Sequence, residues 1–130
     1  MNSIGPEQSH GKVLVVDDDE PILTLLSDIL KAAGYEVSTA QDGGEALRIA
    51  QIQSFDLLLT DLVMPDRDGI EVIQSIRKHQ PNLKIIAISG AFGGGMLRAA
   101  ELLGAHATLP KPCNSNHLLT TVHKVLQSSA

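Results

Sequence analysis

The sequence is poor in cysteine and aromatic residues, and it has no excess of basic charge. Cys113 is the only cysteine among 130 residues, so no disulfide can form within the chain and no cysteine cluster can hold structural zinc. Trp is absent and only one Tyr and two Phe are present, which leaves little to stack on bases or sugars. Ten Lys and Arg against fifteen Asp and Glu give a formal net charge of −5, the opposite of what phosphate-backbone binding requires.

The sequence also has no apolar run long enough to cross a bilayer, and its first eleven residues have no signal-like apolar stretch. With 43% hydrophobic and 19% charged residues, the composition is that of an ordinary globular domain. These features predict an acidic cytoplasmic domain without membrane insertion and without direct contact to nucleic acid. We expect a flexible lead-in over residues 1–11, one folded domain over 12–127 and a short tail over 128–130.

Short β-branched or leucine-rich runs alternate with amphipathic stretches along the chain. The runs predict strands over residues 13–16, 36–40, 57–60, 85–89 and 107–109. Helical spacing of apolar residues predicts helices over 22–33, 45–51, 70–78, 96–103 and 114–126. Five strands alternating with five helices predict an α/β fold, a doubly wound (βα)5 parallel sheet with right-handed crossovers.

The first predicted helix has an apolar stripe that should face the core. The spacing i, i+3, i+4, i+7 of one helix face is followed by Ile22, Leu25, Leu26, Ile29, Leu30 and Ala33. Leu23 falls off this stripe, so we expect it on the outer surface, where a lone leucine is common.

Polar residues stand where four of the predicted strands end. Asp17, Asp18 and Asp19 follow the first strand, Asp61 follows the third, Ser89 ends the fourth and Lys111 follows the fifth. Carboxyl ends of parallel strands share one edge, where open α/β sheets bind ligands, so we expect these side chains to meet. Clustered carboxylates favour a divalent cation such as Mg²⁺, whereas a lysine and a serine suit phosphoryl oxygens. One of the three consecutive aspartates is expected to cap the following helix.

Four segments, in this order and strand context, resemble the receiver domain of two-component response regulators. They are VVDDDE over residues 15–20, LTDLVMP over 59–65 with Asp68-Gly69, ISGA over 88–91, and Gly104-Ala105 followed by Lys111-Pro112. The resemblance extends from about Lys12 to Leu126. It implies the flavodoxin-like fold, with five parallel strands in the order 2-1-3-4-5.

The resemblance also implies a chemistry. Asp61 would accept a phosphoryl group from a histidine kinase or a histidine phosphotransfer protein in a Mg²⁺-dependent reaction, which gives an aspartyl phosphate. The chain would then catalyse only its own phosphorylation and dephosphorylation, and would not be an enzyme acting on other molecules. The implied metal ligands are Asp17, Asp18, Asp61 and the backbone carbonyl of Val63, and the implied phosphoryl-binding residues are Ser89 and Lys111.

The sequence departs from the family pattern in the region that reports phosphorylation. The family places an aromatic residue three positions before the lysine, and this sequence has Thr108 there. The loop that begins at Gly90 and contains Phe92 is the expected substitute switch region. Because the chain ends soon after the last predicted helix, we expect its output to be altered contact with a downstream protein partner.

Two alternatives stay open on the sequence alone. A degenerate receiver would bind partners without phosphorylation, and Thr108 is compatible with that function. A phosphohydrolase of the haloacid-dehalogenase type also uses an aspartate pair after its first strand, which Asp17 and Asp19 match. However, Pro21 occupies the Thr or Val position of that pattern, and the chain is short for that fold.

Overall fold

The computed structural model describes residues 10–62, 69–90, 98, 101, 104–111 and 114–128, which form five strands and four complete helices. The strands are β1 (Lys12–Val16), β2 (Glu36–Ala40), β3 (Leu57–Asp61), β4 (Lys84–Ser89) and β5 (Ala107–Pro110). The helices are α1 (Glu20–Ala32), α2 (Gly43–Ile52), α3 (Gly69–His79) and α5 (Ser115–Gln127). These elements confirm the corresponding predictions, with ends that differ by no more than two residues. Of the helix predicted over 96–103, Arg98 and Glu101 are described and helical.

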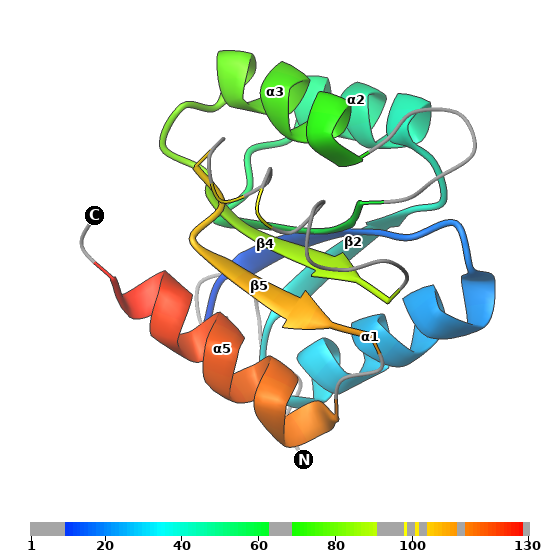
Figure 1. Ribbon diagram of the computed structural model, residues 1–130, viewed down its shortest axis with the longest axis vertical. Coiled ribbons are helices and arrows are strands. Elements are labelled where there is room, and N and C mark those ends of the chain that lie inside the picture. Colours follow the sequence, from blue (N-terminus) through cyan, green and yellow to red (C-terminus); the bar gives the residue numbers. More distant parts are fainter. Residues whose placement is uncertain are drawn as a thin grey trace.

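The five strands form one parallel sheet in the order β2-β1-β3-β4-β5, which confirms the predicted fold class. In this order β1 lies between β2 and β3, so the connection from β1 to β2 and the connection from β2 to β3 run in opposite directions and place α1 and α2 on opposite faces of the sheet. Helices α1 and α5 cover one face, and α2 and α3 cover the other (Figure 1). All strands point the same way, and the residues that follow β1, β3, β4 and β5 therefore meet at one edge of the sheet.

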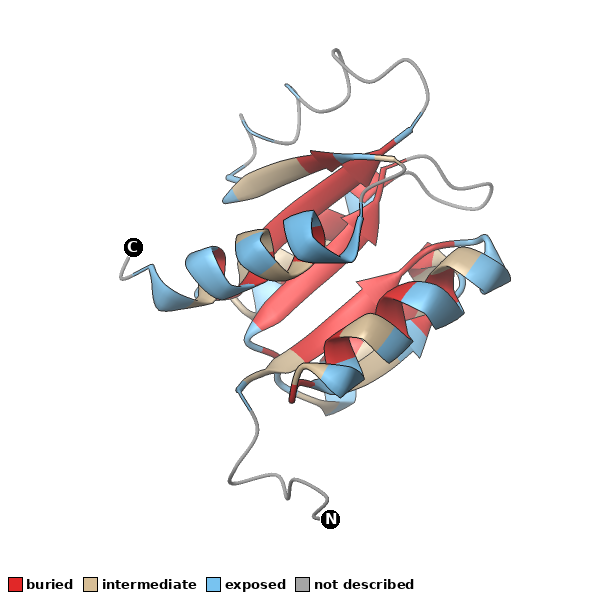
Figure 2. Ribbon diagram, turned by 90° about the horizontal axis from the view of Figure 1, so that it is seen from below, coloured by how far each residue is buried: buried red, intermediate tan, exposed pale blue. Residues whose placement is uncertain are grey.

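The core consists of two apolar layers, one on each face of the sheet. Alternating residues of β3 are shared between them, since Leu58 packs in the layer under α2 and α3 while Leu57 and Leu59 pack in the layer under α1 and α5. All residues of β3 are buried, as a central strand covered on both faces requires. Figure 2 shows the buried sheet between helices whose outer faces are exposed. The site at the strand ends is thus built on the buried centre of the sheet.

The stripe predicted for α1 is confirmed at Leu26 and Leu30, which are buried, and at Ile22, Ile29 and Ala33, which pack partly buried against the core, but the prediction is wrong for Leu23 and Leu25. Leu23 is buried, with 5% of its surface exposed, whereas Leu25 is 57% exposed. The buried face of α1 is formed by Leu23, Leu26, Ser27 and Leu30. This face shares Leu26 and Leu30 with the predicted stripe, but its centre is displaced toward Leu23 and Ser27, and the polar Ser27 conceals this displacement in the sequence.

Polar side chains and one glycine set the ends of the helices. Asp19, Asp42 and Asn114 are the N-caps of α1, α2 and α5, and each accepts a hydrogen bond from a backbone N–H of the first turn. Gly34 lies two residues beyond α1 and has φ of +97°, a backbone conformation that favours glycine and ends the helix. None of the described helices combines the length and apolar character that a membrane span requires.

His106 adds a side-chain hydrogen bond where β5 begins to pair with β4. Its backbone N–H donates to Ile85 O over 2.7 Å, and its ring Nδ1 accepts from the N–H of Ile85 over 3.1 Å. Burial lowers the pKa of His106, and the positive charges of Lys84 and Arg77 lower it further. These groups favour the neutral ring that this hydrogen bond requires.

Candidate functional site

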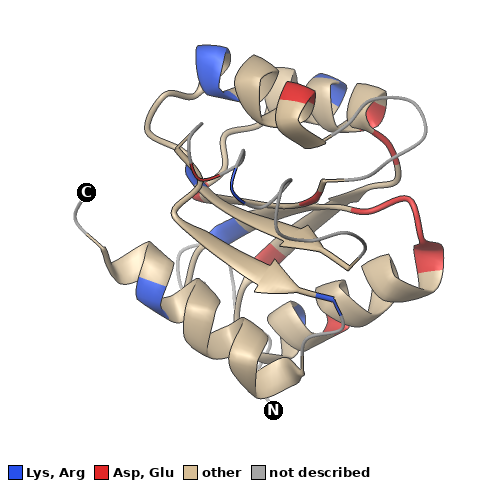
Figure 3. Ribbon diagram, viewed as in Figure 1, with Lys and Arg blue, Asp and Glu red and all other residues tan. Residues whose placement is uncertain are grey.

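Three carboxylates from two neighbouring strands meet at the carboxyl edge of the sheet. Asp17 and Asp18 follow β1, Asp61 is the last residue of β3, and one oxygen from each of these side chains lies within 4.8 Å of the others. Asp17 is 1% exposed and Asp61 is 5% exposed, whereas Asp18 faces solvent. Figure 3 shows the acidic residues that run from the end of β1 into the start of α1. Such a cluster of hard oxygen atoms is unfavourable unless positive charge lies nearby.

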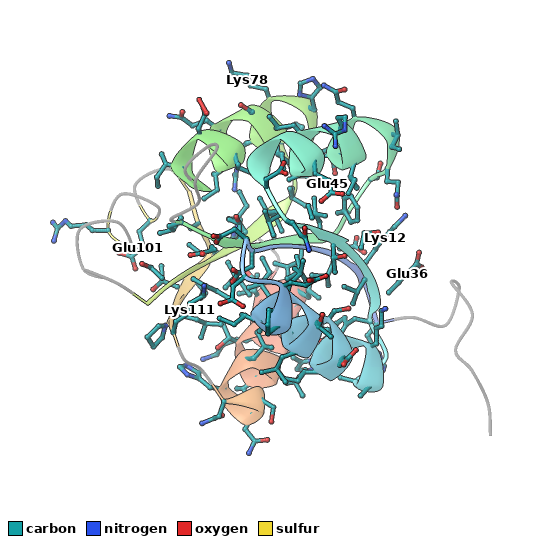
Figure 4. The ribbon with its side chains drawn as sticks, turned by 90° about the vertical axis from the view of Figure 1, so that its right-hand side faces the viewer. Lys12, Glu36, Glu45, Lys78, Glu101 and Lys111 are labelled. Carbon is teal, nitrogen blue, oxygen red and sulfur yellow. The ribbon has the colours of Figure 1, made fainter. Side chains whose placement is uncertain are left out.

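Lys111 supplies positive charge to this cluster from the end of β5. Its Nζ lies 2.9 Å from Asp17 Oδ2 and 3.1 Å from Asp61 Oδ2, so one ammonium group bridges carboxylates from two different strands. Burial lowers the pKa of Lys111, but the contacts and charges of Asp17 and Asp61 outweigh burial and raise the pKa above its usual value of 10.5. Lys111 is therefore a fixed cation at neutral pH. Figure 4 shows it at the opposite end of the sheet from Lys12 and Glu36.

Ser89 and Gly90, at the end of β4, both contact Lys111. Ser89 is the last residue of β4 and is 2% exposed, and its carbonyl accepts a hydrogen bond from the Lys111 backbone N–H over 3.1 Å. A Cβ atom on Gly90 would lie only 2.7 Å from Lys111 Cβ. This close approach needs a residue without a side chain, so Gly90 fits against the base of the lysine side chain.

The three consecutive aspartates have different local surroundings. Asp19 caps α1, since its Oδ1 accepts from the Ile22 N–H over 3.2 Å, and this confirms that one of the three is a helix cap. Asp17 Oδ1 accepts from the Asp19 N–H over 2.9 Å, which turns the Asp17 carboxylate toward the strand ends. Asp18 makes no such contact with the described residues and is left exposed at the rim of the cluster.

The donor set fits a divalent cation. Asp17 Oδ2 is buried and, despite its ion pair with Lys111, receives no hydrogen bond of good geometry from any described residue. With three carboxylates and one ammonium group, the cluster carries a formal charge of −2 when Asp17, Asp18, Asp61 and Lys111 are all ionised. Carboxylate oxygens that keep an excess of negative charge are the ligands preferred by Mg²⁺.

Comparison with known proteins identifies this arrangement. The sequence matches the response regulator receiver domain over residues 13–123. The chain belongs to the response regulator receiver domain family. This result confirms the resemblance seen in the sequence motifs. Receiver domains are the signalling domains of two-component systems, and the family binds Mg²⁺ at an acidic pocket.

The receiver domain is similar both to longer regulators and to single domains. It is 37% identical over 120 residues to the transcriptional regulatory protein CpxR of Escherichia coli K12, which covers 91% of this chain and 50% of CpxR. A CheY-like receiver domain protein of Methanospirillum hungatei JF-1 is 34% identical, with a TM-score of 0.84 over 88% of this chain and 92% of that one. The chemotaxis protein CheY4 of Vibrio cholerae is 36% identical, with a TM-score of 0.82 over 88% of this chain and 97% of that one. The chain spans about half the length of CpxR.

The structure places most of the predicted site residues of the receiver domain together. Asp17, Asp18 and Asp61 form the acidic cluster, Lys111 contacts two of them, and Ser89 lies on the adjacent strand. Gly90 lies against the side chain of Lys111. Two further predicted site residues, Val63 and Phe92, fall outside the described residues.

Thr108, predicted in the switch region, lies on β5 and is half-buried. It is paired with Ala87 of β4, two residues before Ser89. Two other residues that contact Asp61 were not predicted as part of the site. They are Thr60, whose hydroxyl donates to the Asp61 carbonyl, and Gly69, which lies against the same carbonyl.

Proposed function

We propose that this receiver domain accepts a phosphoryl group on Asp61 from a histidine kinase or a histidine phosphotransfer protein. The observation that carries the proposal is the pairing of a buried, strand-end carboxylate with a fixed cation, since Asp61 Oδ2 lies 3.1 Å from Lys111 Nζ. The neighbouring Asp17 and Asp18 supply the oxygen ligands that a Mg²⁺-dependent phosphoryl transfer needs. Family membership supports the same function.

In the proposed reaction, a carboxylate oxygen of Asp61 attacks the phosphorus atom of a phosphohistidine. The new P–O bond forms an acyl phosphate, the P–N bond breaks, and its electron pair leaves with the imidazole. Lys111 is already placed beside Asp61 and would hold a phosphoryl oxygen while the negatively charged phosphoryl group is transferred to the aspartate. The Ser89 hydroxyl, at the end of the adjacent strand, would donate a hydrogen bond to a second phosphoryl oxygen.

Asp17, Asp18, Asp61 and the backbone carbonyl of Val63 would hold the Mg²⁺ ion. When bound, it supplies the positive charge that offsets the repulsion between the carboxylates and the incoming phosphoryl group. The buried oxygen Asp17 Oδ2, which has an ion pair but no hydrogen bond of good geometry among the described residues, supports this assignment.

We further propose that phosphorylation is reported by altered contacts with a downstream protein in the cytoplasm. Gly90, Phe92 and Thr108 form the proposed switch region. Gly90 follows Ser89 directly and lies against Lys111, so movement of either phosphoryl-binding residue would be transmitted to the residues that follow Gly90. Because Thr108 replaces the usual aromatic residue, the readout must proceed without an aromatic side chain turning inward.

The test is phosphoprotein gel mobility after incubation with acetyl phosphate, with and without Mg²⁺. We expect a shifted band that requires Mg²⁺ and is absent in Asp61→Asn. The matched control is Asp28→Asn, an exposed aspartate on α1 outside the acidic cluster, which should shift like the wild type. Because acetyl phosphate does not require partner recognition, this experiment isolates the chemistry of the site.

Two results would contradict the proposal. A folded protein that is labelled neither by acetyl phosphate nor by a histidine kinase would be a degenerate receiver that acts as a phosphate-independent binding module. Continuous turnover of a phosphomonoester would instead indicate a phosphohydrolase of the haloacid-dehalogenase type. The structure gives that second alternative no support, because Asp19, which would have to act with Asp17, is the N-cap of α1.

A further inference from the structure

Asp61 lies at a position where the sheet no longer supports it on both sides. The pairing of β1 with β3 ends at Val16 and Thr60, so Asp61 extends one residue beyond its last partner on β1. On the other side it is still in register with Ile88 of β4. The orientation of its carboxylate therefore depends on how its own peptide group is held at this end of β3.

The Asp61 carbonyl receives a hydrogen bond from the preceding side chain. Thr60 Oγ1 donates to Asp61 O over 2.9 Å, and Thr60 is fully buried. The N–H of the same peptide unit, which belongs to Leu62, donates to Ile88 O over 3.0 Å. Both polar ends of the Asp61–Leu62 peptide are thus fixed, one by a side chain and one by β4.

Gly69 covers the same carbonyl from the start of α3. A Cβ atom at this position would lie 2.3 Å from Asp61 O and 2.6 Å from Leu62 Cα, distances that a real side chain cannot reach. The Gly69 N–H also donates to Leu62 O over 2.9 Å. The absence of a side chain lets the first residue of α3 pack directly on the backbone that carries the phosphoacceptor.

We propose that Thr60 and Gly69 are positioning residues that fix the Asp61–Leu62 peptide and thereby aim the Asp61 carboxylate at Lys111 and the metal ligands. The inference rests on the proposed function of Asp61. Neither residue touches the reacting atoms, since both act on the backbone carbonyl. A peptide plane held at its carbonyl, at its N–H and by close packing leaves little freedom for the adjoining side chain to turn away from Lys111 Nζ, 3.1 Å distant.

The role of the Thr60 hydroxyl can be tested with substitutions that leave no large cavity in the core. Thr60→Val keeps the branched shape and removes the donor, whereas Thr60→Ser keeps the donor and removes a methyl group. Thr39→Val makes the same chemical change on β2, at an exposed position outside the acidic cluster, and serves as the matched control. Thr60→Val is preferred to Gly69→Ala, because a methyl group at Gly69 would clash with backbone and threaten folding.

The experiment measures the rate of Asp61 phosphorylation by acetyl phosphate at saturating Mg²⁺, the Mg²⁺ affinity by calorimetry and the ¹³C carbonyl resonance of Asp61. In Thr60→Val we expect a rate about tenfold lower, as one lost buried hydrogen bond allows, with severalfold weaker Mg²⁺ binding and a displaced carbonyl resonance. Thr60→Ser should restore all three values to near those of the wild type. Thr39→Val should leave them unchanged.

A purely structural role would give a different result. If Thr60→Val lowers the melting temperature but keeps the wild-type rate and Mg²⁺ affinity, the positioning function is wrong. Equal losses in Thr60→Ser and Thr60→Val would also overturn it, because the hydroxyl would then not be the cause. If the wild type itself is not phosphorylated, the proposed function fails, and the Mg²⁺ titration alone decides the positioning: equal affinities for wild type and Thr60→Val refute it.

Discussion

Gly90 illustrates how a single residue can control the placement of Lys111. Its Cα hydrogen faces the lysine so closely that a Cβ atom would lie 2.7 Å from Lys111 Cβ and 3.3 Å from Cδ. The lysine Nζ in turn lies about 3 Å from two carboxylates, so a shift at the base of its side chain is carried to the site. The glycine is therefore part of the geometry that holds the cation.

We predict that Gly90→Ala slows phosphorylation of Asp61 by about tenfold to a hundredfold, the cost of misplacing a group near the reacting atoms. The methyl group must displace either the Gly90 backbone or Lys111. Rates of acetyl phosphate labelling at saturating Mg²⁺ measure the effect. The control is Gly44→Ala in the first turn of α2, outside the site, which should react at the wild-type rate. A wild-type rate in Gly90→Ala would refute the placement of Lys111 described above.

The residues of the site differ in how far the sequence predicts them. Asp17, Asp61 and Lys111 could be found because each is a charged residue directly after an apolar strand, and parallel strands bring such residues to one edge. The role of Thr60 could not be found in this way, because threonine is common inside strands. Its hydroxyl matters only because the strand register leaves Asp61 one residue beyond its last partner on β1, and the sequence does not show that register. Gly69 could be seen in a receiver motif just before a predicted helix, but its contact with Asp61 depends on tertiary packing.

At the scale of elements, α1 shows that the spacing of apolar residues alone does not determine which face of a helix is buried. Two stripes of this helix satisfy the same spacing, and the sequence favours the one without a polar residue. The structure buries Leu23 and Ser27 beside Leu26 and Leu30 of the predicted stripe, and it leaves Leu25 facing solvent. The strands were predicted more closely, because β3 and β4 are buried on both faces and their apolar runs have no second interpretation.

Substitutions on α1 distinguish the two stripes. We predict that Leu23→Ala lowers the free energy of unfolding by about 2–5 kcal/mol, because it leaves a cavity under α1. Leu25→Ala should change it by no more than about 0.5 kcal/mol, since this side chain is 57% exposed. Urea unfolding followed by circular dichroism measures both, because the chain has no Trp to report by fluorescence. Comparable losses for the two variants would show that the helix is not rotated as described.

At the scale of the whole molecule, the site is a local imbalance of charge held by a stable scaffold. Three carboxylates and one ammonium group meet at the carboxyl edge, in a chain that is already acidic overall. Lys111 forms ion pairs with Asp17 and Asp61 but not with the exposed Asp18. Folding therefore brings together negative charges that are separate in the unfolded chain, and the folded state should gain stability from any cation that binds among them.

A substitution of Asp18 distinguishes the stability lost through repulsion between the carboxylates from the stability gained when a cation binds. At a Mg²⁺ concentration ten times the dissociation constant, we predict that the wild type gains about 1.4 kcal/mol of unfolding free energy. Asp18→Asn should be more stable than the wild type without Mg²⁺, because one repelling charge is gone, yet gain much less when Mg²⁺ is added. Urea unfolding with Mg²⁺ and with a chelator measures both changes, and Asp28→Asn, outside the cluster, should respond to Mg²⁺ like the wild type. Because the two effects have opposite signs in one variant, a general loss of stability cannot imitate them, and an undiminished Mg²⁺ response in Asp18→Asn would exclude Asp18 as a ligand.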